Sequence, residues 1–300
     1  MMKFICAILC LVALTFAGSH SALGAMPIPS DLKKTVCFVF VEKDGKLIPN
    51  GTAFFVGIEK PDKTLQHVYL VTAKHVRQSL PDKGIYFLWF AIRLMRREGG
   101  VQQIVIPINL HGVDKTVFIH TDDSVDLAVI PALPKPELFD FKVIPASFLV
   151  DKEQFKSLNI SEGTDVFFAG MFTPHLGKDK NYPVVRFGRV AMLSDEKIEF
   201  RNKQRELYLI ETFSFGGNSG SPTFLYLGQD RAPGSLVLGP PDIKLSGVMS
   251  GAFLSGFPIK ETQTDTSKIS WDNMGIAAVV PCFLLSEILL GEELKTRRGY

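Results

Sequence analysis

The sequence predicts an all-β fold, built from antiparallel barrels or sandwiches, on the strength of two observations. Short runs of branched and aromatic residues recur along the chain, and Gly, Asn, Asp and Pro stand at their borders. Regularly spaced short strands of this kind are typical of barrels and sandwiches. The composition is 46% hydrophobic and only 21% charged, which provides ample material for a core over 300 residues.

A proline-rich connection from Pro131 to Pro145 divides the predicted strands into two groups. The strands before it cover residues 35–41, 53–58, 68–72, 104–108 and 127–130, and those after it cover 165–168, 207–210, 223–227, 245–249 and 275–280. We therefore expect an N-terminal unit over residues 26–145 and a C-terminal unit over residues 146–300.

Residues 1–25 have the pattern of a signal peptide. Lys3 provides a positive start, residues 4–17 are apolar, and residues 21–25 are rich in small side chains. The apolar run is shorter than the roughly 18 residues that a spanning helix needs. We expect a secreted or periplasmic protein with no membrane span after signal cleavage, and the alternative is an uncleaved anchor.

Charge and cysteine content restrict the function classes. Lys and Arg number 33 against 31 Asp and Glu, so the chain lacks the basic excess typical of nucleic-acid-binding proteins. Cys37 and Cys282 remain after removal of the signal peptide, and they form either one disulfide or two buried thiols. No cysteine–histidine spacing indicates zinc and no carboxylate spacing indicates calcium, so we expect no metal and no cofactor.

The segment Gly-Gly-Asn-Ser-Gly-Ser-Pro at residues 216–222 has the chemistry of an acyl-transfer nucleophile. Glycines on both sides of Ser219 allow a sharp turn that exposes its hydroxyl. The amides of Gly217 and Ser219 are then candidates to bind a developing oxyanion. Earlier in the chain, His75 follows Val-Thr-Ala-Lys, and Asp126 precedes Leu-Ala-Val-Ile.

The order histidine, aspartate, serine disfavours the α/β-hydrolase fold. In that fold the histidine follows the serine, whereas no histidine lies after Ser219 in this chain. The hydrolase turn also needs glycine at the position of Ser221. For the carboxylate, only Asp126 precedes a strand that would hold it rigidly in a buried position. The nearby alternatives are Asp114, Asp122 and Asp123, which look like solvated turn residues.

Four blocks, in this order, resemble the trypsin/chymotrypsin-fold serine peptidases, particularly their bacterial secreted and HtrA-like branches. The blocks are residues 51–56 (GTAFFV), 70–76 (LVTAKHV), 126–130 (DLAVI) and 217–222 (GNSGSP), and residues 273–281 extend the match. The resemblance implies two perpendicular six-stranded antiparallel β-barrels with the site between them. It also implies that Ser219 is the nucleophile, His75 the general base and Asp126 the orienting carboxylate, with the oxyanion hole at the Gly217 and Ser219 amides.

Two departures from the digestive members of this family bear on activation. Asn218 replaces the aspartate that, in zymogen-activated members, pairs with a newly cut amino terminus. The predicted mature start near Ala25 also lacks their activation sequence. Both departures favour an enzyme that needs no activating cut.

Alignment with the family also suggests the residues that contact the substrate side chain. The pocket base falls near Phe213, which offers no acid for a basic side chain, and Met249 stands where glutamate-specific relatives carry histidine. We therefore expect a preference for apolar or small P1 residues. The expected pocket walls are Phe213, Ser214, Met249, Ser250, Gly251 and Ala252.

Three further segments have expected roles. An amphipathic C-terminal helix is predicted after Pro281, with its apolar face on the barrels, and leaves no room for a PDZ domain. The segments 228–244 and 255–272 are expected to be loops that frame a substrate cleft. The arginine-rich segment 93–100 is expected to be a solvated loop or strand edge.

The sequence thus predicts a secreted serine endopeptidase that cleaves proteins or peptides through an acyl-enzyme. The alternative is a catalytically inactive protein that uses the same fold as a binding module. Any regulation by a partner would require a separate chain.

Overall fold

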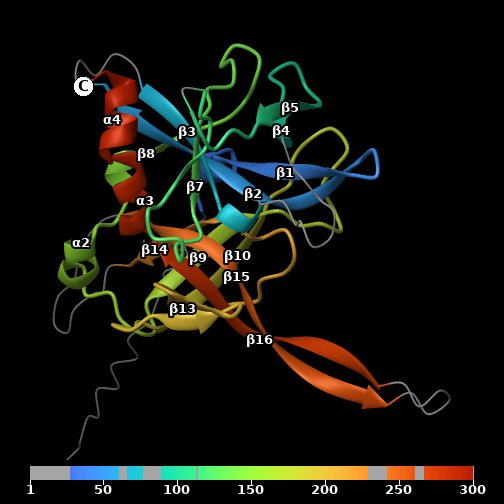
Figure 1. Ribbon diagram of the computed structural model, residues 1–300, viewed down its shortest axis with the longest axis vertical. Helices are drawn as coiled ribbons and strands as arrows, with labels where there is room; N and C mark the ends of the chain where they lie inside the picture. Colours follow the sequence, from blue (N-terminus) through green and yellow to red (C-terminus); the bar gives the residue numbers. More distant parts are fainter. Residues whose placement is uncertain are drawn as a thin grey trace, which may run out of the picture.

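The computed structural model describes residues 28–60, 66–76, 89–112, 114–228, 242–260 and 267–299. The predicted signal peptide lies outside these residues. Two antiparallel β-structures follow one another along the chain, and helices come after them (Figure 1). The predicted all-β class is confirmed.

The N-terminal half forms an eight-stranded sheet. Its strands pair in the order β5-β4-β1-β2-β3-β7-β6, and β8 adds to β2 in parallel. This sheet has more strands than the predicted six, because two short segments, β6 and β8, pair with its longer strands. Its elements are β1 (Val36–Lys43), β2 (Lys46–Glu59), β3 (Gln66–Thr72), β4 (Trp89–Met95), β5 (Val101–Pro107), β6 (Phe118–Ile119), β7 (Ala128–Pro131) and β8 (Ile144–Pro145).

The C-terminal half forms the closed six-stranded barrel that was predicted, in the order β10-β13-β16-β15-β14-β9. Its strands are β9 (Asp165–Gly170), β10 (Val184–Met192), β13 (Tyr208–Glu211), β14 (Pro222–Leu227), β15 (Asp242–Lys260) and β16 (Ser267–Pro281). A separate hairpin of β11 (Ile198–Phe200) and β12 (Lys203–Arg205) lies between β10 and β13 in the chain.

Short helices connect and follow the strands. They are α1 (Ser30–Lys33), η1 (Lys74–Val76), η3 (Ala146–Phe148), α2 (Lys152–Ser157), α3 (Cys282–Leu289) and α4 (Glu292–Arg298). The predicted C-terminal helix is therefore two helices: α3 contacts β15 and β16 of the barrel, and α4 lies beside the N-terminal sheet (Figure 1). Arg298 of α4 donates to the hydroxyl of Tyr69 in β3 at 3.1 Å. Among the described residues, none of the helices has the length and apolar character needed to cross a membrane.

One hydrophobic cluster joins the two halves. It contains Phe54 of the sheet, Phe167 of the barrel and Leu285 of α3, all fully buried. The two thiols lie in different clusters, Cys282 in this one and Cys37 in a second cluster within the sheet. Both are free, so the structure has two buried thiols and no Cys37–Cys282 bridge. Burial raises the pKa of each thiol, as expected for an apolar environment.

Two predicted loops differ from the structure. Residues 255–260 and 267–272 are strands, because β15 and β16 continue as a two-stranded ribbon that projects from the barrel (Figure 1). In the predicted arginine-rich segment, residues 96–99 are exposed as expected, but Arg93 lies in β4 and is buried. Its guanidinium donates to the carbonyls of Leu176 and Gly177 at 3.1 and 2.8 Å. Of the other predicted loop, residues 229–241 lie outside the described residues.

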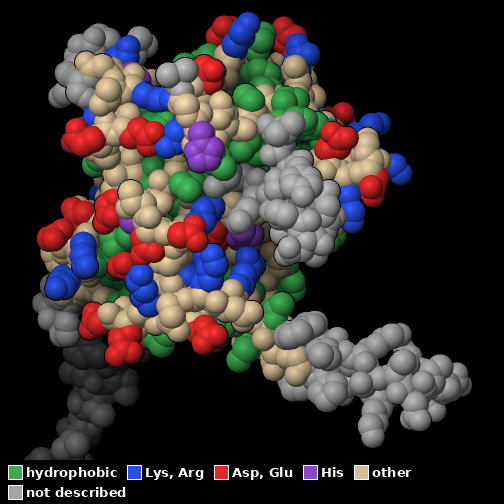
Figure 2. Space-filling model, viewed as in Figure 1, with side chains coloured by type: hydrophobic (Ala, Val, Ile, Leu, Met, Phe, Trp, Pro, Cys, Tyr) green, Lys and Arg blue, Asp and Glu red, His purple; other side chains and the backbone are tan. Residues whose placement is uncertain are grey.

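The visible face of the molecule carries Lys and Arg side chains intermingled with Asp and Glu (Figure 2). No single sign of charge dominates it, in keeping with the nearly balanced composition.

Candidate active site

His75 and Asp126 meet at the ends of two neighbouring strands. β3 pairs with β7 so that Thr72 stands opposite Ala128. His75 lies three residues after Thr72, and Asp126 lies two residues before Ala128, so both fall at the same end of this strand pair. His75 Nδ1 lies 2.7 Å from Asp126 Oδ2, and the His75 amide donates to Asp126 Oδ1 at 3.0 Å. The carboxylate therefore holds both the ring and the backbone of the histidine.

Asp126 is 2% exposed and accepts a third hydrogen bond, from Ser250 Oγ at 2.6 Å. Burial alone would raise the pKa of this carboxyl. The hydrogen bonds and charge of His75, together with the bond from Ser250, outweigh burial and hold the pKa below its usual range. An ionised carboxylate on Nδ1 keeps the proton on that nitrogen and leaves Nε2 able to accept one.

The neighbouring acidic residues have other partners. Asp123 binds Lys74 at 2.8 Å, and Asp122 binds Lys197 at 2.8 Å. Lys74 is itself buried and also donates to the carbonyl of Asp123 at 2.6 Å, which fixes the segment leading to Asp126. Neither Asp122 nor Asp123 forms a described contact with His75, so Asp126 is the carboxylate that the structure pairs with the histidine.

The turn that carries Ser219 is closed by the side chain of Asn218. The Asn218 amide donates to the carbonyl of Met171 at 2.7 Å and accepts from the amide of Phe215 at 2.9 Å. Gly217 and Gly220 have φ values of 97° and 86°, in the left-handed region that favours glycine. The turn is thus held by groups of the chain itself.

Two carbonyl groups of the turn accept hydrogen bonds that fix the peptide planes carrying the Gly217 and Ser219 amides. The Gly216 carbonyl accepts from Thr173 Oγ1 at 3.0 Å, and the Asn218 carbonyl accepts from the amide of Ser221 at 3.1 Å. In a trans peptide the N–H points away from the carbonyl of the same peptide. The Gly217 N–H therefore points away from the bonded Gly216 carbonyl, and the Ser219 N–H away from the bonded Asn218 carbonyl. Within the described part of the chain, neither amide donates a hydrogen bond.

Thr52 of β2 joins the nucleophile turn to the N-terminal sheet, a role that the sequence did not reveal. Its hydroxyl donates to the Gly217 carbonyl at 2.7 Å and accepts from the Met171 amide at 2.9 Å. Its amide donates to the Ser219 carbonyl at 2.9 Å. Thr52 stands in the first motif block, but its spacing to residue 217 gives no signal of contact.

Ser219 and His75 come from different halves, and the described contacts do not include a hydrogen bond between them. Ser219 Oγ instead donates to the main-chain carbonyl of Ser250 at 3.1 Å. Ser250 therefore touches both sides of the site, since its hydroxyl binds Asp126 and its carbonyl binds Ser219. Sequence comparison placed Ser250 only in the pocket wall. Rotation of the Ser219 side chain about Cα–Cβ would release its hydroxyl from the Ser250 carbonyl into another staggered position.

The expected pocket residues are placed unequally. Phe213 and Phe215 are 59% and 54% exposed, and their rings stack at 6.5 Å between centroids. Ser214 is buried, and its carbonyl accepts from Asn273. Met249 is fully buried in the core of the barrel, so its side chain does not line an open cleft. The other expected wall residues, Gly251 and Ala252, follow Ser250 along β15.

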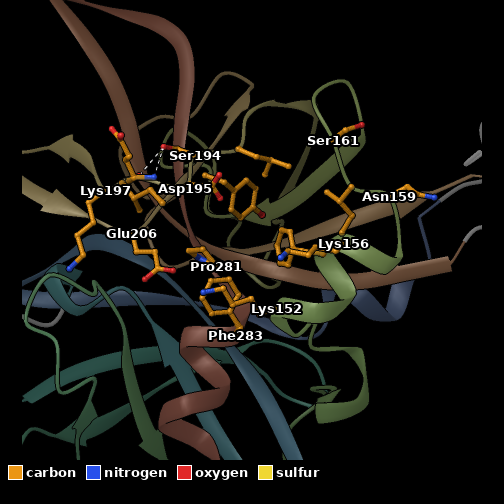
Figure 3. Close-up of a pocket in the computed structure, with 16 residues that line it drawn as sticks. Lys152, Lys156, Asn159, Ser161, Ser194, Asp195, Lys197, Glu206, Pro281 and Phe283 are labelled. Atoms are coloured by element: carbon orange, nitrogen blue, oxygen red, sulfur yellow. Dashed lines mark hydrogen bonds between the residues drawn. The ribbon is translucent and has the colours of Figure 1, made fainter.

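A separate cavity of about 830 Å³ lies at α2, at the strand β13 and at the start of α3 (Figure 3). Its lining mixes both signs of charge with aromatic rings. Lys152, Glu206 and Phe283 are examples, and the Lys152 ammonium lies 5.6 Å from the centre of the Phe283 ring. No residue of the four motif blocks lines it, although Pro281, at the end of the extended match, does. Among the described residues, no group of three or more His, Cys, Asp or Glu side chains is arranged to hold a metal ion.

Comparison with solved structures finds similar chains at low identity. The MamO protease domain from Magnetospirillum magneticum is 14% identical, with a TM-score of 0.48 over 86% of this chain and 97% of that one. A structure of HBP is 10% identical, with a TM-score of 0.47 over 89% and 94%. An inactive serine-to-alanine form of Rv3671c from M. tuberculosis H37Rv is 17% identical, with a TM-score of 0.42 over 90% and 93%. No protein-family model matches the chain, and no curated protein matches it significantly.

A closed six-stranded antiparallel barrel packs through a shared core against a second antiparallel sheet. The sheet carries His75 and Asp126, and the turn before β14 of the barrel carries Ser219. The chain is thus all-β, with a closed antiparallel barrel and a second antiparallel sheet that each carry part of the candidate site.

Proposed function

We propose that the protein is a serine endopeptidase that cleaves peptide bonds through an acyl-enzyme. The observation that carries this proposal is the hydrogen-bonded His75–Asp126 pair beside a serine turn, with Ser250 bonded to both. Acyl transfer requires an imidazole oriented by a carboxylate, a serine hydroxyl, and two amide N–H groups that are free to bind an oxyanion.

Each part has a role in the proposed cycle. The Ser219 hydroxyl leaves the Ser250 carbonyl, transfers its proton to His75 Nε2 and attacks the scissile carbonyl carbon. The amides of Gly217 and Ser219 bind the oxyanion, while Asp126 stabilises the imidazolium. His75 then protonates the leaving amine, the C–N bond breaks, and an ester to Ser219 remains. His75 then takes a proton from a water molecule, which attacks the ester. The bond from the acyl carbon to Ser219 Oγ breaks, His75 returns the proton to Ser219, and the carboxylic acid product leaves.

The enzyme is proposed to need no activating cut. In zymogen-activated relatives a new amino terminus organises the nucleophile turn. Here the Asn218 side chain closes that turn with Met171 and Phe215, and all three groups belong to the uncut chain. We further propose that the protein acts outside the cytoplasm, in the medium or the periplasm, on the basis of the signal-peptide pattern in residues 1–25.

For the substrate, we propose an apolar or small P1 residue. Met249 is buried, the other expected wall residues carry no ionisable side chain, and Phe213 and Phe215 present apolar surface beside the turn. Cleavage of a proteome-derived peptide library gives the P1 profile directly. A profile dominated by Arg, Lys or Glu contradicts this preference.

A catalytically inactive binding module is the second candidate, favoured by the lack of a described hydrogen bond between Ser219 and His75. Covalent labelling by a fluorophosphonate separates the two. Labelling is expected in the unmodified protein and in Ser194→Ala, a matched control at an exposed serine. It is expected to vanish in Ser219→Ala and to fall sharply in His75→Ala. Failure of the folded, unmodified protein to react supports the binding module.

A further inference from the structure

The hairpin of β11 and β12 presents an arginine at its tip in an unfavourable backbone conformation. The two-residue turn consists of Arg201 and Asn202, with φ values of 52° and 58°. Turns with two left-handed residues favour Asn and Gly, because a larger side chain crowds its own backbone. Such conformations concentrate at functional sites. The position therefore invites the question of what Arg201 contacts.

Arg201 differs from the other cations of this hairpin region. Three of them bind the segment that leads to Asp126: Lys197 binds Asp122 at 2.8 Å, Lys203 binds Asp123 at 3.2 Å, and Arg205 binds the carbonyl of Ser124 at 3.0 Å. In the described part of the molecule, the guanidinium of Arg201 forms neither an ion pair nor a hydrogen bond. Its contact is with an aromatic ring, since its guanidinium carbon lies 5.1 Å from the centre of the Phe200 ring.

The guanidinium lies directly beside the candidate active site. A methyl group added to Gly251 would come within 2.6 Å of a terminal nitrogen of Arg201. Gly251 follows Ser250, whose carbonyl binds Ser219 Oγ. The ring of Phe200 is buried and packs against Phe253 at 4.9 Å, so the guanidinium rests on a fixed surface. Arg201 is thus held beside Gly251, the residue that follows Ser250, and the Ser250 carbonyl contacts the nucleophile.

The strand under Arg201 has a free edge. β14 pairs with β15 only as far as Val248, and the main chain of Met249 bonds to the nucleophile turn. From Gly251 onward, the pairing recorded for the described residues joins β15 to β16 alone. An extended peptide can add to such an edge. A peptide whose scissile carbonyl reaches Ser219 would then place the residues before that carbonyl alongside residues 250–252, beside Arg201.

We propose that Arg201 is a specificity-determining residue that binds an aspartate or glutamate of the substrate, two to four residues before the scissile bond. This inference rests on the proposed peptidase function. A guanidinium presents two parallel N–H donors to a carboxylate and stays charged at all relevant pH values. Arg201 binds the acidic residue at a position other than P1. One substrate can therefore satisfy both the acidic preference and the preference for an apolar or small P1 residue.

The test compares peptides that share an apolar P1 residue and carry Glu or Gln at P2, P3 or P4. We expect the Glu peptide to exceed its Gln partner about 10-fold in kcat/KM at one of these positions, as for a partly exposed charge-assisted pair. Arg201→Gln removes the preference, and Arg201→Glu transfers it to a Lys peptide. Lys203→Gln, which removes a paired cation two residues away, retains it. High salt weakens the preference.

A second measurement keeps the test independent of turnover. Fluorescent Glu and Gln peptides are titrated into Ser219→Ala, with and without Arg201→Gln, and their anisotropy gives the dissociation constants. A Glu preference in binding, with no cleavage by the unmodified protein, refutes the peptidase function and upholds the role of Arg201. Equal kcat/KM and equal binding for every Glu–Gln pair overturn the inference. So does an equal loss with all peptides in Arg201→Gln. Arg201 is close enough to Asp126 for their charges to interact, and an equal loss would show that Arg201 acts only through that carboxylate.

Discussion

The two sides of the candidate site are assembled in different ways. His75 and Asp126 lie at the ends of adjacent strands of one sheet, and two hydrogen bonds join them directly. Ser219 belongs to the other half, and its hydroxyl bonds to the Ser250 carbonyl instead of the imidazole. The His75–Asp126 pair forms within one half and gains one hydrogen bond from Ser250 of the barrel, whereas the serine turn is joined to the sheet through Thr52. The predictions below test this contrast, beginning with the largest effect.

Replacing the carboxylate breaks the pair that forms within one half. Asp126→Asn retains the shape but presents an amide to His75, which favours the wrong imidazole tautomer. We expect kcat/KM to fall by roughly 10⁴. Asp123→Asn is the matched control, since Asp123 binds Lys74 and Lys203 but not the histidine. Initial rates on one peptide measure both, and similar losses in the two variants would contradict the assignment.

Removing the link between the two sides has a smaller effect. Ser250→Ala deletes the hydrogen bond to Asp126 but keeps the carbonyl that binds Ser219. A buried carboxylate that loses one donor costs about 1.5–3 kcal/mol, so we expect roughly a 10- to 100-fold loss of kcat/KM. Ser246→Ala removes another buried hydroxyl of β15, bonded to Tyr208. It should lower stability and spare activity, and a rate loss equal to that of Ser250→Ala would argue against a specific role.

The join between the halves is tested at Thr52. Thr52→Val keeps the volume but leaves the Gly217 carbonyl and the Met171 amide without their partner. We expect the free energy of unfolding to fall by about 1–3 kcal/mol, measured by urea denaturation. Thr223→Val is the control, because the Thr223 hydroxyl is buried without a hydrogen bond and its loss should be neutral or stabilising. Equal destabilisation by both variants would show that the Thr52 bonds contribute nothing.

The smallest effect is a pH dependence of stability. The pKa of Asp126 is lower in the folded chain than its ordinary value of 3.8, so the folded state favours the ionised form. This contribution is fully present above about pH 5 and is lost as the pH falls below about 4 toward the folded pKa. Denaturation midpoints of the unmodified protein should therefore decline more steeply between about pH 5 and 3 than those of Asp126→Asn. Parallel curves would contradict the shifted pKa.

The same contrast explains what could be predicted from the sequence. His75 and Asp126 were found because each adjoins a strand of its own motif, and local pattern and chain order sufficed. The regularly spaced strands predicted barrels or sandwiches, and the resemblance to the trypsin/chymotrypsin-fold peptidases implied the six-stranded barrel. Contacts between the halves leave no such pattern, and so the role of Thr52 was missed. Buried Arg93 was mistaken for a solvated residue for the same reason, since its partners near Leu176 belong to the other half.

The position of α3 and α4 has a consequence for how the molecule unfolds. The helix α3 packs against β15 and β16 of the barrel, whereas α4 binds β3 of the sheet through Arg298 and Tyr69. Leu285 of α3 shares one core with Phe54 and Phe167. A half that separated from the other would expose this common core to water. The protein should therefore behave as a single cooperative unit, with one calorimetric transition in which the van't Hoff and calorimetric enthalpies agree. The two halves are then distinct in topology, but they do not unfold independently.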